Sequence, residues 1–186
     1  LPPYIFGEIN SLKMKLRSEG RDIIDFGMGN PDMPTPLHIR QKLKEVVDKP
    51  GVGRYSVSKG INGLRKAQAK YYKKRFNVEL NPSSEIIVTI GSKEGLANLA
   101  QAITSKGDRI LCPDPSYPVH PYGFTIAGAK LKPLKTIYNG EFNPHKYLIN
   151  IERNMKLNTR IKAVIVSFPS NPTAQTVDLD FYKDLV

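Results

Sequence analysis

The stretch Glu85-Ile-Ile-Val-Thr-Ile-Gly-Ser-Lys-Glu-Gly-Leu-Ala-Asn-Leu-Ala-Gln-Ala-Ile103 decides the fold class of this chain. It opens with a short apolar run rich in β-branched residues, Ile86 to Ile90, which predicts a strand. Apolar residues then recur at helical spacing up to Ile103, which predicts a helix directly after that strand. A second apolar run, Arg109 to Cys112, predicts the next strand. A strand, a helix and a strand in this order are typical of a βαβ unit with parallel strands.

The same alternation continues towards the end of the chain. We expect a helix from Val119 to Ala127, a strand from Lys130 to Leu134 and, most clearly, a buried strand from Lys162 to Phe168. Strands that alternate with helices predict an α/β fold with a mostly parallel sheet and flanking helices. A last helix begins near Asp178, and the sequence stops at Val186 without a capping signal. We therefore expect this domain to be incomplete.

The earlier part of the chain predicts an extended segment and two helices. The run Ile23 to Phe26 is expected to form a strand or an extended arm. Thr35 as N-cap and Pro36 as first helical residue predict a helix that reaches about Asp48. A stripe of apolar and aromatic residues from Leu64 to Phe76 predicts the second helix.

The composition is that of a globular protein with an unusual charge. The 186 residues are 40% hydrophobic and carry a formal net charge of +11. The basic residues are spread over polar positions of the predicted elements, which favours a solvated surface over a nucleic-acid interface. No apolar run is long enough to span a membrane, and no signal-like segment opens the sequence. The single cysteine, Cys112, cannot form an internal disulfide, so we expect a cytoplasmic location and a packing role for its side chain.

Three loops at the predicted C-terminal ends of strands could carry chemistry, since open α/β sheets bind ligands there. In the first, Gly91 and Ser92 join a strand to a helix through small residues. Backbone amides at a helix start attract an anion, and the small residues would let a phosphate approach closely. A helix that is merely capped by Ser92 is the alternative.

The other two loops are Asp114-Pro115-Ser116-Tyr117-Pro118 and Ser170-Asn171-Pro172-Thr173. Two prolines hold Tyr117 rigidly, which suits stacking on a flat ligand, although a tyrosine that packs on the core is the more ordinary outcome. Asn171 offers an amide side chain held still by the next proline, but Asn-Pro is also common in turns. Neither loop identifies a ligand by itself.

Other candidate sites are weaker. Gly27-Met28-Gly29 and Gly51-Val52-Gly53 lack the third glycine of a dinucleotide fingerprint, and the chain has no P-loop. No cysteine and histidine cluster has the spacing of metal ligands. His38, His120 and His145 are isolated in sequence, so we expect surface or capping roles for them.

Five segments follow one another in an order that is more specific than any one of them. They are Met28-Gly29-Asn30-Pro31-Asp32, Tyr55 with Gly60 and Leu64-Arg65, Gly91-Ser92-Lys93-Glu94-Gly95-Leu96, Asp114-Pro115-Ser116-Tyr117-Pro118 and Asn171-Pro172-Thr173. Together they resemble the class I and II aminotransferases of the fold-type I pyridoxal-phosphate family. The resemblance runs through nearly the whole chain.

The resemblance implies that the cofactor is pyridoxal 5′-phosphate. Ser92 and Lys93 would hold its phosphate, and the hydroxyl of Tyr55 would reach that phosphate from the neighbouring subunit of a homodimer. Tyr117 would stack on the pyridine ring. Asn171 would donate a hydrogen bond to the phenolic oxygen of the ring, which favours its electron-poor form.

The resemblance also implies an activity, the movement of an amino group between an L-amino acid and a 2-oxo acid. The backbone amide of Gly29 would contact the substrate carboxylate, and Tyr4 would line the substrate pocket. Several of these segments look most like bacterial alanine (glutamate-pyruvate) aminotransferases, near the diaminopimelate branch, so alanine and glutamate are the expected amino donors. Ala174 is a departure, because the family often has glycine after Asn-Pro-Thr.

The family's Schiff-base lysine is expected beyond Val186, and neither Lys59 nor Lys93 fits its motif. Residues 1–34 would then be an N-terminal arm, with part of the small domain and a substrate loop. Residues 35–186 would be an incomplete cofactor-binding large domain that is inactive alone.

Two alternatives stay open. The 186 residues could act as a non-catalytic truncated product or a binding module. The parent protein could also be another fold-type I enzyme, such as a carbon–sulfur lyase.

Overall fold

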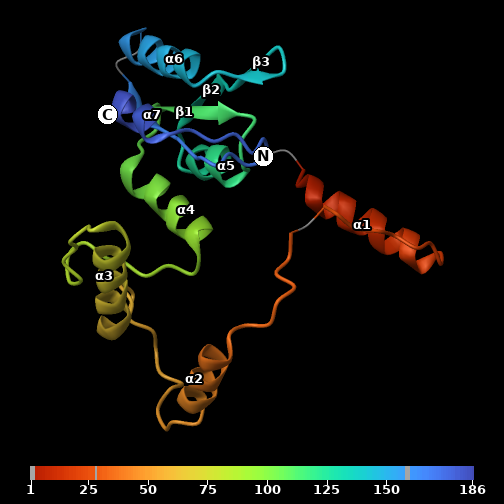
Figure 1. Cartoon of the computed structure of the whole chain (residues 1–186), viewed down its shortest axis with the longest axis vertical. Helices are drawn as coiled ribbons and strands as arrows, with labels where there is room; N and C mark the ends of the chain where they lie inside the picture. The colour runs from red at the N-terminus through yellow and green to blue at the C-terminus, as the bar shows by residue number, and fades with distance from the viewer. Residues whose placement is uncertain (1–2, 28, 158–159) are drawn as a thin grey trace. The chain divides into compact units, whose positions relative to one another are not determined.

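The computed structural model describes residues 3–27, 29–157 and 160–186, and the chain divides into two units, Leu1–Val57 and Ser58–Val186 (Figure 1). The first unit contains α1 (Ile5–Ser18) and α2 (Leu37–Val47). The elements of the second unit are α3 (Asn62–Phe76), α4 (Ser92–Ile103), β1 (Arg109–Asp114), α5 (Val119–Ile126), β2 (Lys130–Lys135), β3 (Ile137–Tyr138), β4 (Glu141–Phe142), α6 (Pro144–Leu157), β5 (Ile161–Val164) and α7 (Leu179–Leu185). Within the described residues, no helix is long and apolar enough to cross a membrane.

The first unit consists of helices and the segments between them. The predicted helix after Thr35 is present as α2, but its N-cap is Pro36, and no side chain caps it. The residues from Ile23 to Phe26 form no strand and no helix. Lys13 of α1 donates a hydrogen bond of 2.8 Å to Asp25, which ties this segment to the helix and lowers the pKa of the Asp25 carboxyl.

The second unit contains the predicted parallel sheet, with strand order β2-β1-β5. Ile110 of the central strand pairs with Leu131 of β2 on one side and with Ala163 of β5 on the other. Both pairings are parallel, so the α/β prediction is confirmed. Residues Ile110 to Cys112 are buried, as expected for a parallel strand that helices cover on both faces.

Successive side chains of β1 point into two separate cores, because a strand alternates its faces. Ile110 packs with Ala100 of α4 and Phe124 of α5. Leu111 packs on the opposite face, with Tyr147 of α6 and Phe181 of α7. Figure 1 shows α6 on one side of the sheet and α5 on the other, so the strands lie between two helical layers.

The strand predicted from Ile86 to Ile90 is wrong in this structure. The segment is extended, but its one backbone hydrogen bond to a distant residue runs from the Val88 N–H to the Lys59 carbonyl, at 3.1 Å. A strand needs a hydrogen-bonded neighbour. Both edges of β1 are already occupied, and Ile87 and Ile90 are 66% and 92% exposed. The apolar run therefore lies unpaired in the described part of the chain.

The most confident strand prediction, Lys162 to Phe168, is only partly correct. The strand begins at Ile161 and ends at Val164, and its residues are half-buried or exposed rather than fully buried. After it, the Ile165 N–H still bonds the Leu111 carbonyl, at 2.9 Å. The run has β1 on one side and no described strand on the other, so its outer backbone edge has no strand partner among the described residues.

Sequence analysis missed a hairpin and a helix between residues 137 and 157. Asn139 and Gly140 connect β3 to β4 with φ angles of 52° and 85°. Two residues with positive φ are typical of the Asn-Gly turn of a two-residue hairpin. The helix is α6, whose buried Tyr147 and Ile151 are four residues apart and so share one face.

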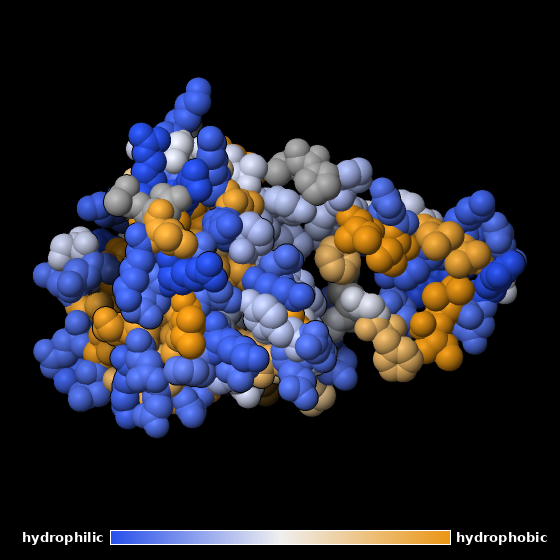
Figure 2. All heavy atoms as spheres, turned by 90° about the horizontal axis from the view of Figure 1, so that it is seen from above, coloured by the Kyte–Doolittle hydropathy of each residue, from blue (hydrophilic) through white to orange (hydrophobic). Residues whose placement is uncertain are grey.

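Apolar side chains are widely exposed, and orange patches are visible on the face drawn in Figure 2. Ile24 and Phe26 of the first unit are 76% and 94% exposed. None of the described residues of this unit is buried. Its helices thus show amphipathic faces that residues 1–57 do not cover.

Candidate functional site

The first predicted loop forms the start of α4. Gly91 is the N-cap, with φ of 84°, and Ser92 is the first helical residue. The alternative of a cap by the Ser92 side chain is therefore wrong. The Glu94 carboxylate instead accepts a hydrogen bond from the Ile90 N–H. A Cβ placed on Gly91 would meet no atom within 4 Å, so the space beside the helix start is open.

This helix start has the donors that an anion needs. A helix of 12 residues leaves its first N–H groups without intrahelical acceptors and concentrates positive potential there. The Ser92 hydroxyl and the Lys93 ammonium belong to the same first turn. Backbone donors, a hydroxyl and a cation together are the chemistry that a phosphate prefers.

The structure brings the second loop to this helix start. The ammonium nitrogen of Lys93 lies 5.4 Å from the centre of the Tyr117 ring, which is cation–π distance. Behind this contact α4 packs against α5, and a Cβ placed on Gly123 would lie 3.6 Å from the Cα of Ala97. Two residues that are 24 positions apart in the sequence thus share one site.

Hydrogen bonds hold the backbone just before Tyr117. The carbonyl of Asp114 accepts from both the N–H and the hydroxyl of Thr136, each at 3.1 Å. The Cys112 sulfur and the Ser116 hydroxyl oxygen are 3.5 Å apart. Burial raises the pKa of the Cys112 thiol, so it stays protonated and packs in β1, in keeping with its predicted role.

Sequence analysis underestimated His120. Its ring lies edge-on to the Tyr117 ring, with 6.0 Å between their centres, and the backbone N–H of His120 donates to the Tyr117 carbonyl at 3.0 Å. The Nδ1 atom is buried and has no hydrogen-bond partner among the described residues. Burial lowers the pKa of His120, which favours the neutral imidazole, and this neutral ring packs against Tyr117. Its position three residues after Tyr117, at a helix start, is the sequence signal that could have pointed to it.

The third loop follows β5. The Ser170 carbonyl accepts from the Ala174 N–H at 2.7 Å, and the Ser170 and Thr173 hydroxyl oxygens lie 2.9 Å apart. Asn171 is exposed at the tip of this tight turn. Because β1 and β5 are parallel neighbours, the loops that follow them lie at the same edge of the sheet. The loop of Asn171 therefore shares that edge with the loop of Tyr117.

The remaining predicted residues, Tyr4, Gly29 and Tyr55, belong to the first unit. The Tyr55 side chain is fully exposed and free to contact another molecule. The ring of Tyr4 lies 5.5 Å from that of Phe6. Gly29 is exposed, and a Cβ placed there would meet no atom within 4 Å. Their roles remain predictions.

Met28, from the loop of Gly29, lies outside the described residues. Across the described ranges, no group of three or more histidine, cysteine, aspartate or glutamate side chains could hold a metal ion.

Comparisons with known proteins agree with this arrangement. The family model described as aminotransferase class I and II matches residues 21–186. The chain is 47% identical to the glutamate-pyruvate aminotransferase AlaC of Escherichia coli, and the match covers 100% of the chain and 44% of AlaC. It is 38% identical to the LL-diaminopimelate aminotransferase of Syntrophobacter fumaroxidans, with coverage of 100% and 47%.

A solved structure shows the same fold. A mutant of Thermus thermophilus aspartate aminotransferase superposes with a TM-score of 0.87 at 27% identity, covering 100% of the chain and 47% of that protein. The chain thus spans less than half the length of these relatives.

Proposed function

Because the chain belongs to the class I and II aminotransferase family, we propose that the complete protein moves an amino group between an L-amino acid and a 2-oxo acid. Pyridoxal phosphate is the cofactor of this family. The observation that carries the proposal is the contact between the Lys93 ammonium and the Tyr117 ring beside the open start of α4. It combines an anion site and an aromatic face, which are the two features that a phosphorylated ring requires.

The residues at the start of α4 fit the phosphate of the cofactor. Ser92 would donate its hydroxyl, and the N–H groups of the first turn would point at the phosphate oxygens. Lys93 would add a positive charge. The open space at Gly91 supports this role, because no side chain fills the approach to the helix start.

Tyr117 and Asn171 fit the ring of the cofactor. When bound, pyridoxal phosphate supplies a sink for the electrons left on the α-carbon of an amino acid when it loses a proton. Tyr117 would hold the plane of the ring, supported at its own edge by His120. Asn171 would donate its amide hydrogen to the phenolic oxygen and so keep electron density away from the reacting carbon. Both residues act by orientation and hydrogen bonding.

We also propose roles for three residues of the first unit. Tyr55 would reach the phosphate from the second subunit of a homodimer, and its fully exposed side chain supports a role towards another chain. The Gly29 amide would bind the substrate carboxylate, and Tyr4 would line the substrate pocket. We place the covalent lysine outside residues 1–186. Lys93 contacts the Tyr117 ring at the start of α4, and Lys59 lies three residues before α3, in the segment that leads into that helix.

We propose alanine and glutamate as amino donors, with their 2-oxo acids as partners, and a cytoplasmic location. The 47% identity to a glutamate-pyruvate aminotransferase supports this choice. The 38% identity to LL-diaminopimelate aminotransferases supports diaminopimelate as the second candidate. We propose no nucleic-acid partner and no membrane partner for this protein.

Spectroscopy of the complete protein tests both activity and donor. The cofactor-loaded protein is mixed with one amino acid at a time, and the absorbance of the protein-bound pyridoxal form of the cofactor is followed. This absorbance should fall faster with alanine and with glutamate than with LL-diaminopimelate. The proposal fails if no amino acid changes the spectrum. Borohydride reduction followed by peptide mapping should find no modified lysine within residues 1–186, and a modified Lys59 or Lys93 would contradict the assignment.

A further inference from the structure

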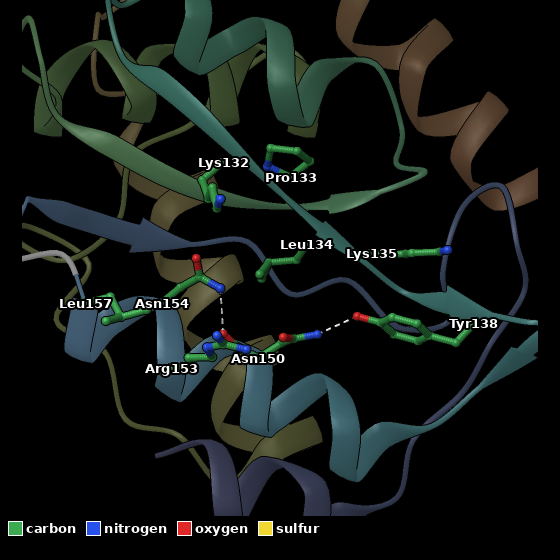
Figure 3. A pocket seen from close by; sticks show the side chains of 9 residues that line it. All are labelled: Lys132, Pro133, Leu134, Lys135, Tyr138, Asn150, Arg153, Asn154 and Leu157. Carbon is green, nitrogen blue, oxygen red and sulfur yellow. Dashed lines mark hydrogen bonds between the residues drawn. The ribbon is translucent and has the colours of Figure 1, made fainter.

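One pocket of the second unit lies away from the residues assigned to the cofactor. It is a cavity of about 330 Å³ between β2 and α6 (Figure 3). Its lining residues are Lys132, Pro133, Leu134, Lys135, Tyr138, Asn150, Arg153, Asn154 and Leu157. None of Ser92, Lys93 and Tyr117 is among them. The pocket lies within the second unit and does not depend on the proposed function.

The charges of this lining have one sign. Lys132, Lys135 and Arg153 are cationic, and no aspartate or glutamate lines the pocket. None of these three makes an ion pair with a described residue. By contrast, Lys156 on the same helix α6 has an acidic partner, since it forms a salt bridge with Glu152. The pocket thus concentrates positive potential that the protein leaves uncompensated.

The neutral groups of the pocket are held in place. The Asn150 amide donates to the Tyr138 hydroxyl, and the Asn154 amide donates to the Asn150 carbonyl at 2.8 Å. The Lys135 ammonium lies 5.3 Å from the centre of the Tyr138 ring. Each hydroxyl or amide here still has a donor or acceptor site for a ligand. The pocket therefore has a fixed polar wall on α6 and on the chain after β2.

The two ends of the pocket differ. Figure 3 shows Lys132 extending from β2 towards the side of α6 that carries Arg153 and Asn154, whereas Lys135 and Tyr138 lie at the other end. Arginine binds carboxylate and phosphate with a planar fork, and lysine adds a mobile point charge. The geometry at the first end suits one anionic group, and the second end provides another cation.

We propose that this pocket binds a small organic anion with two or more negative charges. A phosphate ester and a dicarboxylate share this chemistry. The cavity is within the size range of small-molecule sites, which favours a metabolite over a polymer. Such a ligand would neutralise Lys132 and Arg153 at once, and its binding would weaken as salt screens the charges.

The test uses the complete protein saturated with pyridoxal phosphate, so that the cofactor's own phosphate site is filled. Isothermal titration calorimetry at low ionic strength measures the binding of two probes, inorganic pyrophosphate and succinate. We expect one site per chain for at least one probe, and the tighter probe identifies the anionic group. The affinity should fall as sodium chloride is added.

Charge-matched variants locate the site. The Lys132→Gln/Arg153→Gln variant should bind about tenfold or more weakly, because two charged contacts are lost. The Lys70→Gln/Lys146→Gln variant removes the same charge from exposed positions outside the pocket, and its affinity should change by less than about twofold. Melting temperatures check that both variants fold. If the first variant unfolds, Asn154→Asp replaces it, since a carboxylate in the pocket should repel the probe.

Two outcomes would overturn the proposal. One is the absence of saturable binding of either probe to the cofactor-loaded protein. The other is a Lys132→Gln/Arg153→Gln variant that binds no more weakly than the Lys70→Gln/Lys146→Gln variant, which would mean that the probes respond to the overall charge of +11 or bind at another site. Binding that only the pocket variant weakens would support it.

Discussion

The ammonium of Lys93 lies 5.4 Å from the centre of the Tyr117 ring, so the start of α4 and the loop after β1 form one site. Neither loop identified a ligand by itself. Their contact places the proposed anion site beside an aromatic face at the edge of the sheet where ligands bind in open α/β folds.

Replacing Tyr117 with leucine should weaken cofactor binding by about three- to tenfold, because an aromatic contact is lost. Tyr117→Phe keeps the ring and should bind nearly as tightly as the unchanged protein. Spectroscopic titration of the complete protein with pyridoxal phosphate measures both affinities. An equal loss in the two variants would show that the hydroxyl, and not the face of the ring, makes the contact.

Gly60→Ala should destabilise the second unit by about 2 kcal/mol or more. Gly60 has φ of 85°, and a Cβ there would lie 2.2 Å from Cγ2 of Val88. The matched control is Gly63→Ala in α3, where a Cβ meets no atom within 4 Å. This control should be neutral or stabilising by up to about 1 kcal/mol, since alanine favours a helix over glycine. Urea unfolding of both variants measures the difference, and equal stabilities would contradict the prediction.

Ala174→Gly should stabilise the protein by about 0.5–1 kcal/mol. Ala174 has φ of 59°, a left-handed conformation that strains any residue with a Cβ. Glycine removes this strain, although its more flexible unfolded state offsets part of the gain. The free energy of unfolding is again the measurement. A loss of stability would mean that the Ala174 methyl contributes packing that exceeds the strain.

His120 should make stability depend on pH. Burial lowers its pKa below the ordinary value of 6.5, so the unfolded state takes up a proton before the folded state does. The stabilisation is present above pH 6.5 and is lost as the pH falls from there through the folded pKa. The His120→Asn variant should lose this part of the dependence, whereas His145→Asn should keep it. Thermal melts between pH 5 and pH 8, a range set by histidine chemistry, make the comparison. Parallel curves for His120→Asn and the unchanged protein would contradict the assignment.

Short-range patterns predicted most of the second unit correctly. The helical stripe after Ser92, the strands at β1 and β2 and the helix that begins near Asp178 follow from local patterns, and the structure confirms each of them. The Asp178 carboxylate accepts from the Phe181 N–H at 3.0 Å, as an N-cap does. Local patterns succeed here because a single element determines them. The Asn139-Gly140 turn was equally local and was simply overlooked.

Whether the other predicted strands form depends on a neighbouring strand with which they can form hydrogen bonds. The run from Ile86 to Ile90 has the composition of a strand, but composition cannot supply the neighbour that a strand needs. β5 likewise ends at Val164, before the end of its apolar run. The arrangement of parallel strands is non-local, so it depends on which edges are occupied.

The sequence by itself determined the order of Ser92, Lys93, Tyr117 and Asn171, and its resemblance to the aminotransferases predicts that these residues hold a phosphorylated ring. Only the tertiary structure decided that Lys93 meets Tyr117 and that His120 supports the tyrosine as a neutral group. The physical reason is that contact and burial arise from packing of α4 and α5 against β1. Sequence spacing carries no record of that packing.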